Sequence, residues 1–130
     1  MELKRFLAFD EDDLIVMSAH LEGAEILVSN IAYLAKDKRF VLVAERQDPE
    51  NRHEKHMTGL HFDRVARVMT SHMPKDNSEV LRLIGITFEP KLAPSGSVVL
   101  IFENQCAIRL DVECLEASLS DLPDDSERKD

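Results

Sequence analysis

Histidine residues gather near the middle of the chain and could bind a metal ion. His53 and His56 lie three residues apart, and His61 follows them. Glu50 and Glu54 lie close by and could add carboxylate oxygens. A zinc site needs three or four nitrogen, oxygen or sulfur ligands about 2 Å from the ion, but this spacing matches neither the H-E-x-x-H helix motif nor a cysteine-anchored site. His53, His56 and His61 are therefore weak metal candidates, and surface histidines are the favoured interpretation.

Four consecutive acidic residues, Asp10-Glu11-Asp12-Asp13, could bind Mg²⁺ or Ca²⁺. They lack the spacing of an EF-hand loop, which has a central glycine and a terminal glutamate. Asp10 is instead typical of a helix N-cap, and negative charge in a first turn interacts favourably with the helix dipole. The cluster therefore predicts the start of a helix rather than a metal site.

Neither cysteine of the chain lies in a motif for nucleophilic catalysis. Cys106 alternates with Ile108 and Leu110, which predicts a side chain that points into the core. Cys114 lies among acidic residues such as Glu113, and their negative charge disfavours its thiolate. The four glycines are far apart, which excludes a glycine-rich phosphate loop. The sequence thus predicts no catalytic residue and no cofactor.

The cysteines and the N-terminal residues also bear on the cellular compartment. Two cysteines without paired metal-ligand spacing favour buried thiols in a reducing compartment over a structural disulfide. The N-terminal residues lack the apolar run of a secretory signal, and no stretch has the roughly 18–20 apolar residues of a membrane span. A cytoplasmic location is therefore predicted.

The formal net charge is −9, which argues against general binding to nucleic acid or to an anionic membrane. The charge is uneven, because residues 36–75 hold nine Lys or Arg against six Asp or Glu, whereas the rest holds seven against nineteen. A basic patch from this segment would suit an acidic protein or a phosphorylated ligand. Its members would be Lys36, Lys38, Arg39, Arg46, Arg52, Lys55, Arg64 and Arg67. The alternative is that these side chains scatter over several faces.

The first half of the chain shows the patterns of one helix and several strands. Residues 3–9 alternate as in a strand, and residues 10–21 then place apolar side chains on one helical face that ends at a glycine. Residues 25–34 and 40–44 are β-prone and flank a polar turn, which predicts a hairpin. The polar residues 47–55 predict a loop long enough to be functional.

The second half continues with strands and is predicted to end in a helix. Strand patterns cover residues 58–69, 80–88, 97–103 and 106–112, and Asn104-Gln105 predicts a tight reversal between the last two. The final apolar stripe has helical spacing. It consists of Val112, Leu115, Leu119 and Leu122.

These patterns together describe one domain. Residues 1–122 are predicted to form a single α+β domain, followed by an acidic, disordered tail at 123–130. Runs of strands with helices at the ends indicate a mainly antiparallel sheet or partly closed barrel of about seven to eight strands, with an N-terminal and a C-terminal helix. This element order resembles that of pleckstrin-homology-like barrels. An open sheet must protect its edges, which is consistent with a homodimer.

Several segments resemble a small family of bacterial proteins, mostly alphaproteobacterial, known as the domain of unknown function DUF2948. The segments are residues 12–21, 32–34 with 39–40, 58–62 with 64–65, and 108–114. In that family, the loop that corresponds to residues 51–56 is usually richer in arginine. The resemblance implies a bacterial cytoplasmic protein. It transfers no catalytic or binding residue, because none is assigned in the family.

The leading hypothesis from the sequence is a non-enzymatic binding or protein-interaction module. It rests on the lack of a catalytic constellation and on the basic middle segment. The alternative is a small metal-dependent enzyme or metal-binding protein that uses the histidine-containing region 53–72. A pocket that brings His56, His61 and Glu50 together would favour the enzyme.

Overall fold

The computed structural model describes residues 5–48, 50, 51 and 53–122. These residues form ten strands, one α-helix and two short 3₁₀ helices, and all strand pairings among them are antiparallel. The elements are β1 (Arg5–Ala8), α1 (Glu11–Leu21), β2 (Glu25–Leu27), η1 (Val28–Asn30), β3 (Ile31–Leu34), η2 (Ala35–Asp37), β4 (Arg39–Gln47), β5 (Lys55–Phe62), β6 (Val65–Ser71), β7 (Val80–Pro90), β8 (Gly96–Phe102), β9 (Ala107–Val112) and β10 (Ala117–Asp121).

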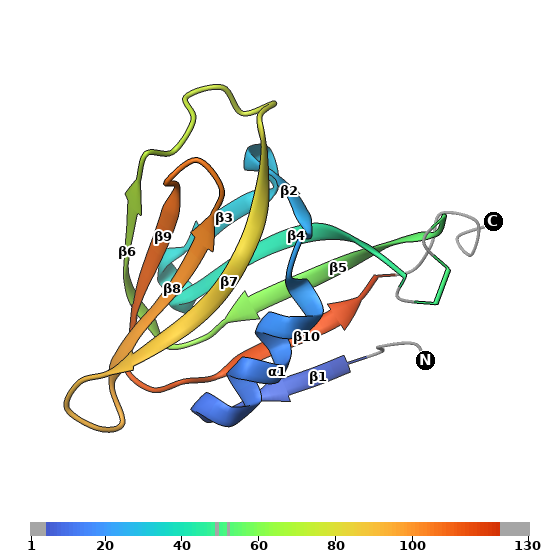
Figure 1. Ribbon diagram of the computed structural model, residues 1–130. Coiled ribbons are helices and arrows are strands. Elements are labelled where there is room, and N and C mark those ends of the chain that lie inside the picture. Colours follow the sequence, from blue (N-terminus) through green and yellow to red (C-terminus); the bar gives the residue numbers. More distant parts are fainter. Residues whose placement is uncertain (1–4, 49, 52, 123–130) are drawn as a thin grey trace.

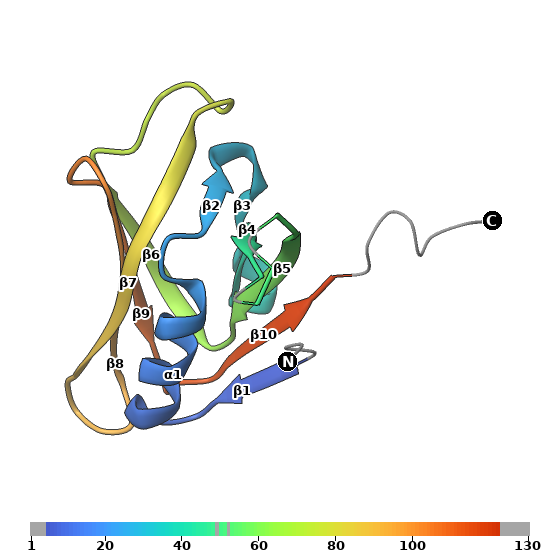
Figure 2. The same cartoon turned by 45° about the vertical axis from the view of Figure 1, so that its right-hand side comes forward.

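One continuous sheet folds back on itself to form two walls (Figures 1 and 2). Its strand order is β1-β10-β5-β4-β2-β7-β8-β9-β6, and β3 pairs beside β4. The short strand β2 joins the walls, because Glu25 pairs with Glu45 of β4 and with Arg82 of β7. Among the described residues no pairing joins β1 to β6, so the sheet is not closed. The prediction of a mainly antiparallel α+β fold is confirmed at this level.

Apolar side chains that face each other across the two walls fill the core. Along β4, Phe40, Leu42 and Ala44 are buried and alternate with more exposed residues, as expected for a strand with one face on the core. Phe62 of β5 and Phe102 of β8 are fully buried as well. Burial of each such aromatic ring stabilises the fold by about 1.5–3 kcal/mol.

The helix α1 lies against β1 and β7 (Figure 1) and begins where the sequence predicted. The Asp10 side chain caps it by accepting a hydrogen bond from the Asp13 backbone N at 2.8 Å. Leu14 and Met17 are buried, and the Ser18 hydroxyl accepts a hydrogen bond from the Ile86 backbone N at 2.9 Å. That bond satisfies a donor on the edge that β7 exposes beyond its pairing with β2.

None of the helices in the described part of the chain has both the length and the apolar character that crossing a bilayer requires.

Both predicted tight turns are present, and each uses a left-handed backbone. Lys38 has a φ of 52° in the turn that leads into β4, which confirms the hairpin of β3 and β4. Asn104 and Gln105 have φ values of 65° and 64° between β8 and β9. Two consecutive positive φ values are typical of a type I′ turn, whose twist matches that of the flanking strands.

The predicted number of strands, seven to eight, is too low. The pattern at residues 58–69 predicts one strand region, but the chain reverses at Arg64, which has a φ of 62°, and the region is divided into β5 and β6. The 3₁₀ helix η1 likewise divides residues 25–34 into β2 and β3. Interruptions of two or three residues are too short to end the β-prone pattern on either side, which is why periodicity alone does not reveal them.

The predicted C-terminal helix is wrong. Residues 117–121 form β10, which pairs with β1 on one side and with β5 on the other. Leu115, Ala117 and Leu119 are buried with a period of two, although Leu115 and Leu119 also fit a helical stripe. Cys114 therefore lies in a turn rather than at a helix start, and the comparison with pleckstrin-homology-like barrels loses its C-terminal helix. The predicted tail, 123–130, lies outside the described residues.

Alanine substitutions at Leu119 and Leu122, two leucines of the apolar stripe that predicted a C-terminal helix, test whether this segment is a strand. Leu119 is fully buried, whereas Leu122 is 37% exposed. We expect Leu119→Ala to lower the free energy of unfolding by about 2–5 kcal/mol and Leu122→Ala by less than about 1 kcal/mol, measured by urea denaturation. Equal losses at both positions would instead favour the helix.

Candidate functional site

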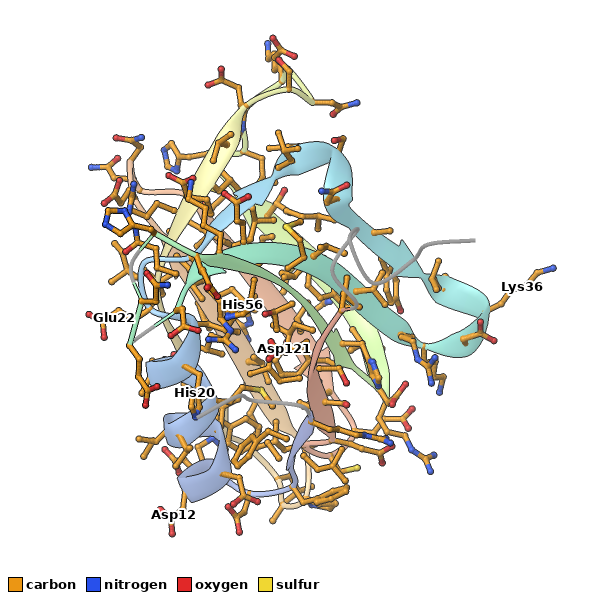
Figure 3. All side chains as sticks on the ribbon, turned by 90° about the vertical axis from the view of Figure 1, so that its right-hand side faces the viewer. Asp12, His20, Glu22, Lys36, His56 and Asp121 are labelled. Atoms are coloured by element: carbon orange, nitrogen blue, oxygen red, sulfur yellow. The ribbon has the colours of Figure 1, made fainter. Side chains whose placement is uncertain are left out.

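A cleft of about 510 Å³ lies where the last turn of α1, the start of β2 and the β4–β5 hairpin meet. Figure 3 shows His20 and Glu22 of this region on the same side of the molecule as His56, with Lys36 at the opposite edge. The lining is strongly charged and contains more carboxylates than cations. Its charged members are Glu22, Glu25, Glu45, Asp48, Arg46, Lys55 and Arg82.

The path of the chain after α1 creates this cleft. Gly23 has a φ of +84°, a conformation that glycine adopts easily and that reverses the chain. The Gly23 N then donates to the Leu83 carbonyl at 2.8 Å, and the Leu83 N donates to the Ala24 carbonyl at 2.9 Å. These two bonds hold the chain beside β7, so Glu25 enters the sheet between β7 and β4.

Two glutamates lie opposite each other in the sheet at the boundary of the cleft. Glu25 and Glu45 are directly opposite in the pairing of β2 with β4. Like charges in this position destabilise a sheet, and each carboxylate has one cation beside it. Arg82 Nη2 lies 2.9 Å from Glu25 Oε2, and Lys55 Nζ lies 3.4 Å from Glu45 Oε1. All four side chains are substantially exposed, so these ion pairs are individually weak.

A second, more apolar hollow of about 240 Å³ is lined by the same two glutamates. Leu27, Val43, Met57 and Val80 supply its apolar lining. Met57 and Val80 are 40% and 54% exposed. Glu25 and Glu45 therefore stand between a polar and an apolar hollow.

A histidine–aspartate pair occupies the β4–β5 hairpin beside the cleft. His56 Nε2 lies 2.9 Å from Asp48 Oδ2. The other oxygen of Asp48 accepts hydrogen bonds from the backbone N atoms of Glu50 and Asn51, at 2.8 and 3.1 Å. These contacts, led by that with His56, lower the pKa of Asp48 to about 2. Potential metal-ligand atoms of Asp48, Glu54 and His56 all lie within 4.8 Å of one another.

A buried ion pair closes the floor of the cleft. Arg46 Nη2 donates to both carboxylate oxygens of Asp121, at 2.9 and 3.0 Å, and Arg46 Nε donates to the Thr58 hydroxyl at 3.1 Å. The Thr58 hydroxyl in turn donates to Asp121 at 2.9 Å. Arg46 is 8% exposed, and no buried side-chain polar atom in the described residues lacks a partner. The network ties β4, β5 and β10 together.

The three predicted metal candidates lie in different surroundings. His56 belongs to the cluster with Asp48 and Glu54, whereas His53 is exposed and His61 lies 3.5 Å from Asp63. Burial lowers the pKa of His61, which favours its neutral form. Sequence reasoning missed Asp48. The only signal for it is the hairpin register, which brings the two ends of the loop together through a bond from the Asp48 N to the Glu54 carbonyl at 3.0 Å.

The predicted basic residues are distributed along the sheet, and most lie beside a carboxylate. Lys38, Arg39 and Arg64 lie at one end of the β4–β5 pair, and Arg46 and Lys55 at the other. The ion pairs are Lys38–Glu113, Arg39–Asp63, Arg46–Asp121, Lys55–Glu45, Arg64–Glu116 and Arg67–Asp111. Lys36 is exposed at the far edge (Figure 3), and Arg52 lies outside the described residues. Most of the positive charge of the segment is thus balanced by acidic residues.

The buried and half-buried thiols do not form part of the cleft. Cys106 is buried and Cys114 is half-buried, and both are free. Burial raises the pKa of the Cys106 thiol, which makes it a poor nucleophile at neutral pH. The prediction that Cys106 points into the core is confirmed, whereas Cys114 is only half-buried.

Comparison with known proteins identifies the family. The model of a protein family of unknown function, DUF2948, matches residues 4–130. The chain belongs to the DUF2948 family. The resemblance in the sequence segments is therefore confirmed, whereas the bacterial source stays a prediction. No curated protein and no solved structure matches this DUF2948 chain.

The pair of His56 and Asp48 can be tested by titration. We expect His56→Ala to raise the pKa of Asp48 from about 2 towards the ordinary carboxyl value, because the largest stabilising contact of the carboxylate is lost. NMR titration of the Asp48 carboxyl carbon, in buffer with a metal chelator, measures this. His53→Ala is the control and should leave the pKa unchanged.

The same titration determines how the contribution of the Asp48–His56 pair to folding stability changes with pH. The pKa of Asp48 is lower in the folded protein than in the unfolded chain, so the pair contributes its full stability above the unfolded pKa. That stability is lost as the pH falls towards 2. A midpoint at the ordinary carboxyl value in the native protein would contradict the contact.

Because Arg46 is buried and Arg82 is exposed, we expect their substitution to lower the free energy of unfolding by very different amounts. Arg46→Met leaves the Asp121 carboxylate without a cation, with only the Thr58 hydroxyl bonded to it, and we expect a loss of about 3 kcal/mol in the free energy of unfolding. Arg82→Met removes an ion pair of the same length that is about half exposed, and it should cost less than about 1 kcal/mol. Urea denaturation of both variants checks this order, and similar losses would contradict the assignment of Arg46 as a structural residue.

Proposed function

We propose that the protein is a non-enzymatic binding module whose two adjoining hollows accept a cationic group next to an apolar group. An arginine or lysine side chain beside an apolar residue in a peptide has this chemistry. The observation that carries the proposal is the pair of Glu25 and Glu45, which face each other where the polar and the apolar hollow adjoin.

Electrostatics favours a cation at this position. Two carboxylates that face each other repel, and a positive group between them relieves the repulsion. Glu22 and Asp48 add negative charge to the lining of the cleft. The last turn of α1 also presents the negative end of its dipole there. Each of these contributions is small, and Arg46, Lys55 and Arg82 of the same lining offset part of the negative charge.

The sizes and polarities of the two hollows suit a ligand that has both a charged and an apolar group. Ligand sites in proteins usually occupy about 300–1,000 Å³ and combine apolar walls with a few polar groups. The polar cleft has about 510 Å³ and the apolar hollow about 240 Å³. Binding of an apolar group would also cover Met57 and Val80, which are exposed at present.

Other charged residues near the cleft already have partners within the protein. Arg46 is engaged by Asp121 and Thr58 and is the buried support of the cleft rather than a group that can turn to a ligand. The earlier expectation of an acidic protein or phosphorylated ligand on the basic residues stays a prediction. Such a partner would have to compete with the ion pairs of Lys38, Arg39 and Arg67.

A set of three matched peptides tests the proposal. The labelled peptides carry Leu-Arg-Leu, Leu-Gln-Leu or Leu-Glu-Leu in one common context, and fluorescence anisotropy measures their dissociation constants. We expect the arginine peptide to bind most tightly. Glu25→Gln and Glu45→Gln should each weaken it about two- to fivefold, because an ion pair with a partly exposed carboxylate is worth at most about 1 kcal/mol.

Glu89→Gln is the control variant, since Glu89 lies at the far end of β7 and does not line either hollow. It should bind the arginine peptide as the wild type does. Equal affinity for the three peptides, or unchanged binding by both glutamine variants at the site, would refute the proposal.

A further inference from the structure

We propose that Asp48, Glu54 and His56 form a binding site for a divalent transition-metal ion, with Zn²⁺ the best fit, at the rim of the polar cleft. The site goes beyond the proposed peptide-binding function. It shares only Asp48 with the lining of the cleft.

The donor set has the chemistry of a metal site. Two carboxylates and one imidazole provide oxygen and nitrogen ligands, both of which Zn²⁺ accepts at about 2.0–2.2 Å. With a neutral imidazole the cluster carries two negative charges, which a divalent ion neutralises. The nitrogen ligand favours Zn²⁺ over Mg²⁺, which prefers oxygen donors and octahedral geometry.

The distances require only a small adjustment. Two donors bound to one ion at about 2.1 Å lie roughly 3.0–3.4 Å apart in octahedral or tetrahedral geometry. His56 Nε2 and Asp48 Oδ2 are already 2.9 Å apart. The widest separation within the cluster is at most 4.8 Å, so a movement of one donor by no more than about 1.5 Å is needed. Glu54 is exposed, and rotation about its side-chain bonds supplies that movement.

The surroundings hold Asp48 in place and keep Glu54 nearby. The backbone N atoms of Glu50 and Asn51 bind one oxygen of Asp48, which leaves the other oxygen directed at His56. The Asn51 side chain donates to Glu54 at 3.1 Å and keeps that carboxylate near the pair. Hydrogen bonds of this kind orient the ligands of known metal sites.

The cleft supplies the remaining coordination position. Because Asp48 lines a cleft of about 510 Å³, an ion bound here would be open to water or to a further ligand on that side. Three protein ligands with one open position is the arrangement of zinc sites that exchange a ligand, in contrast to closed structural sites. A three-ligand, exposed site of this kind should bind Zn²⁺ at micromolar rather than nanomolar concentration.

Isothermal titration calorimetry with ZnCl₂ on the untagged full chain tests the site. We expect one Zn²⁺ per chain and a tenfold or greater loss of affinity in His56→Ala and in Glu54→Gln. His53→Ala and His61→Ala are the matched controls and should bind as the wild type does. Both are histidines of the same region that lie outside the cluster. Mg²⁺ should bind at least tenfold more weakly than Zn²⁺.

A second measurement separates metal binding from damage to the fold. Zn²⁺ should raise the thermal midpoint of the wild type and of His53→Ala, because the ion binds only the folded hairpin, and at the same Zn²⁺ concentration it should raise that of Glu54→Gln by clearly less. Zn²⁺ binding that survives in both cluster variants, or no binding by the wild type, would overturn the proposal. Either result leaves the peptide assay with Glu25 and Glu45 unaffected, so the two proposals can fail separately.

Discussion

The arrangement of the molecule depends on a strand of three residues. Glu25 in β2 is paired on both sides, with Glu45 of β4 and with Arg82 of β7, and this is the point where the two walls of the sheet are joined. The junction forms because Gly23 turns the chain and bonds to Leu83 immediately after α1 ends. Residues 23–25 thus connect α1 to the junction of the two walls and line the cleft between them. The same constraint puts Glu25 opposite Glu45, so the joint that unites the walls also places two like-charged residues on neighbouring strands.

Charge in this protein is organised by tertiary structure rather than by sequence position. The middle segment is basic and the rest is acidic, but the ion pairs connect the two: Lys38 lies beside Glu113, and Arg67 beside Asp111. The contact with Lys38 lowers the pKa of Glu113. A segment with net positive charge therefore does not by itself predict a positive surface. The carboxylate excess at the cleft is equally invisible in the sequence, because its members come from α1, β2, β4 and the hairpin loop.

The features that the sequence predicted are those that neighbouring residues determine. The cap at Asp10, the apolar face of α1 and the turn at Asn104-Gln105 all depend on a few consecutive residues. The C-terminal helix failed because Leu115 and Leu119 fit both a helical and a strand spacing, and pairing with β1 and β5 decided between them. Such pairing is a long-range interaction that a single-sequence pattern does not contain.

The residues of the candidate sites likewise divide into those that the local sequence indicates and those that only long-range pairing brings together. His56 was recognised as a candidate ligand, since histidine is conspicuous in a polar loop. Asp48 was missed because its proximity follows from the hairpin register. Glu25 and Glu45 were missed because they lie in different strands that meet only through β2. Composition and spacing thus identify the residue types that could act, and the sheet pairing decides which of them meet.

The ion pairs around the cleft are of two kinds: one that stabilises the fold, and exposed ones whose cation a ligand can replace. Arg46 of the pair with Asp121 is buried and also bonds Thr58, so replacing Arg46 would leave the largely buried Asp121 carboxylate with only the Thr58 hydroxyl. The pairs of Glu25 and Glu45 with Arg82 and Lys55 are exposed, and such pairs contribute only about 0–1 kcal/mol. A ligand cation can therefore displace Arg82 or Lys55 at small cost, whereas the floor beneath it stays fixed. This difference makes the surface pairs, and not the buried one, the part of the structure suited to binding.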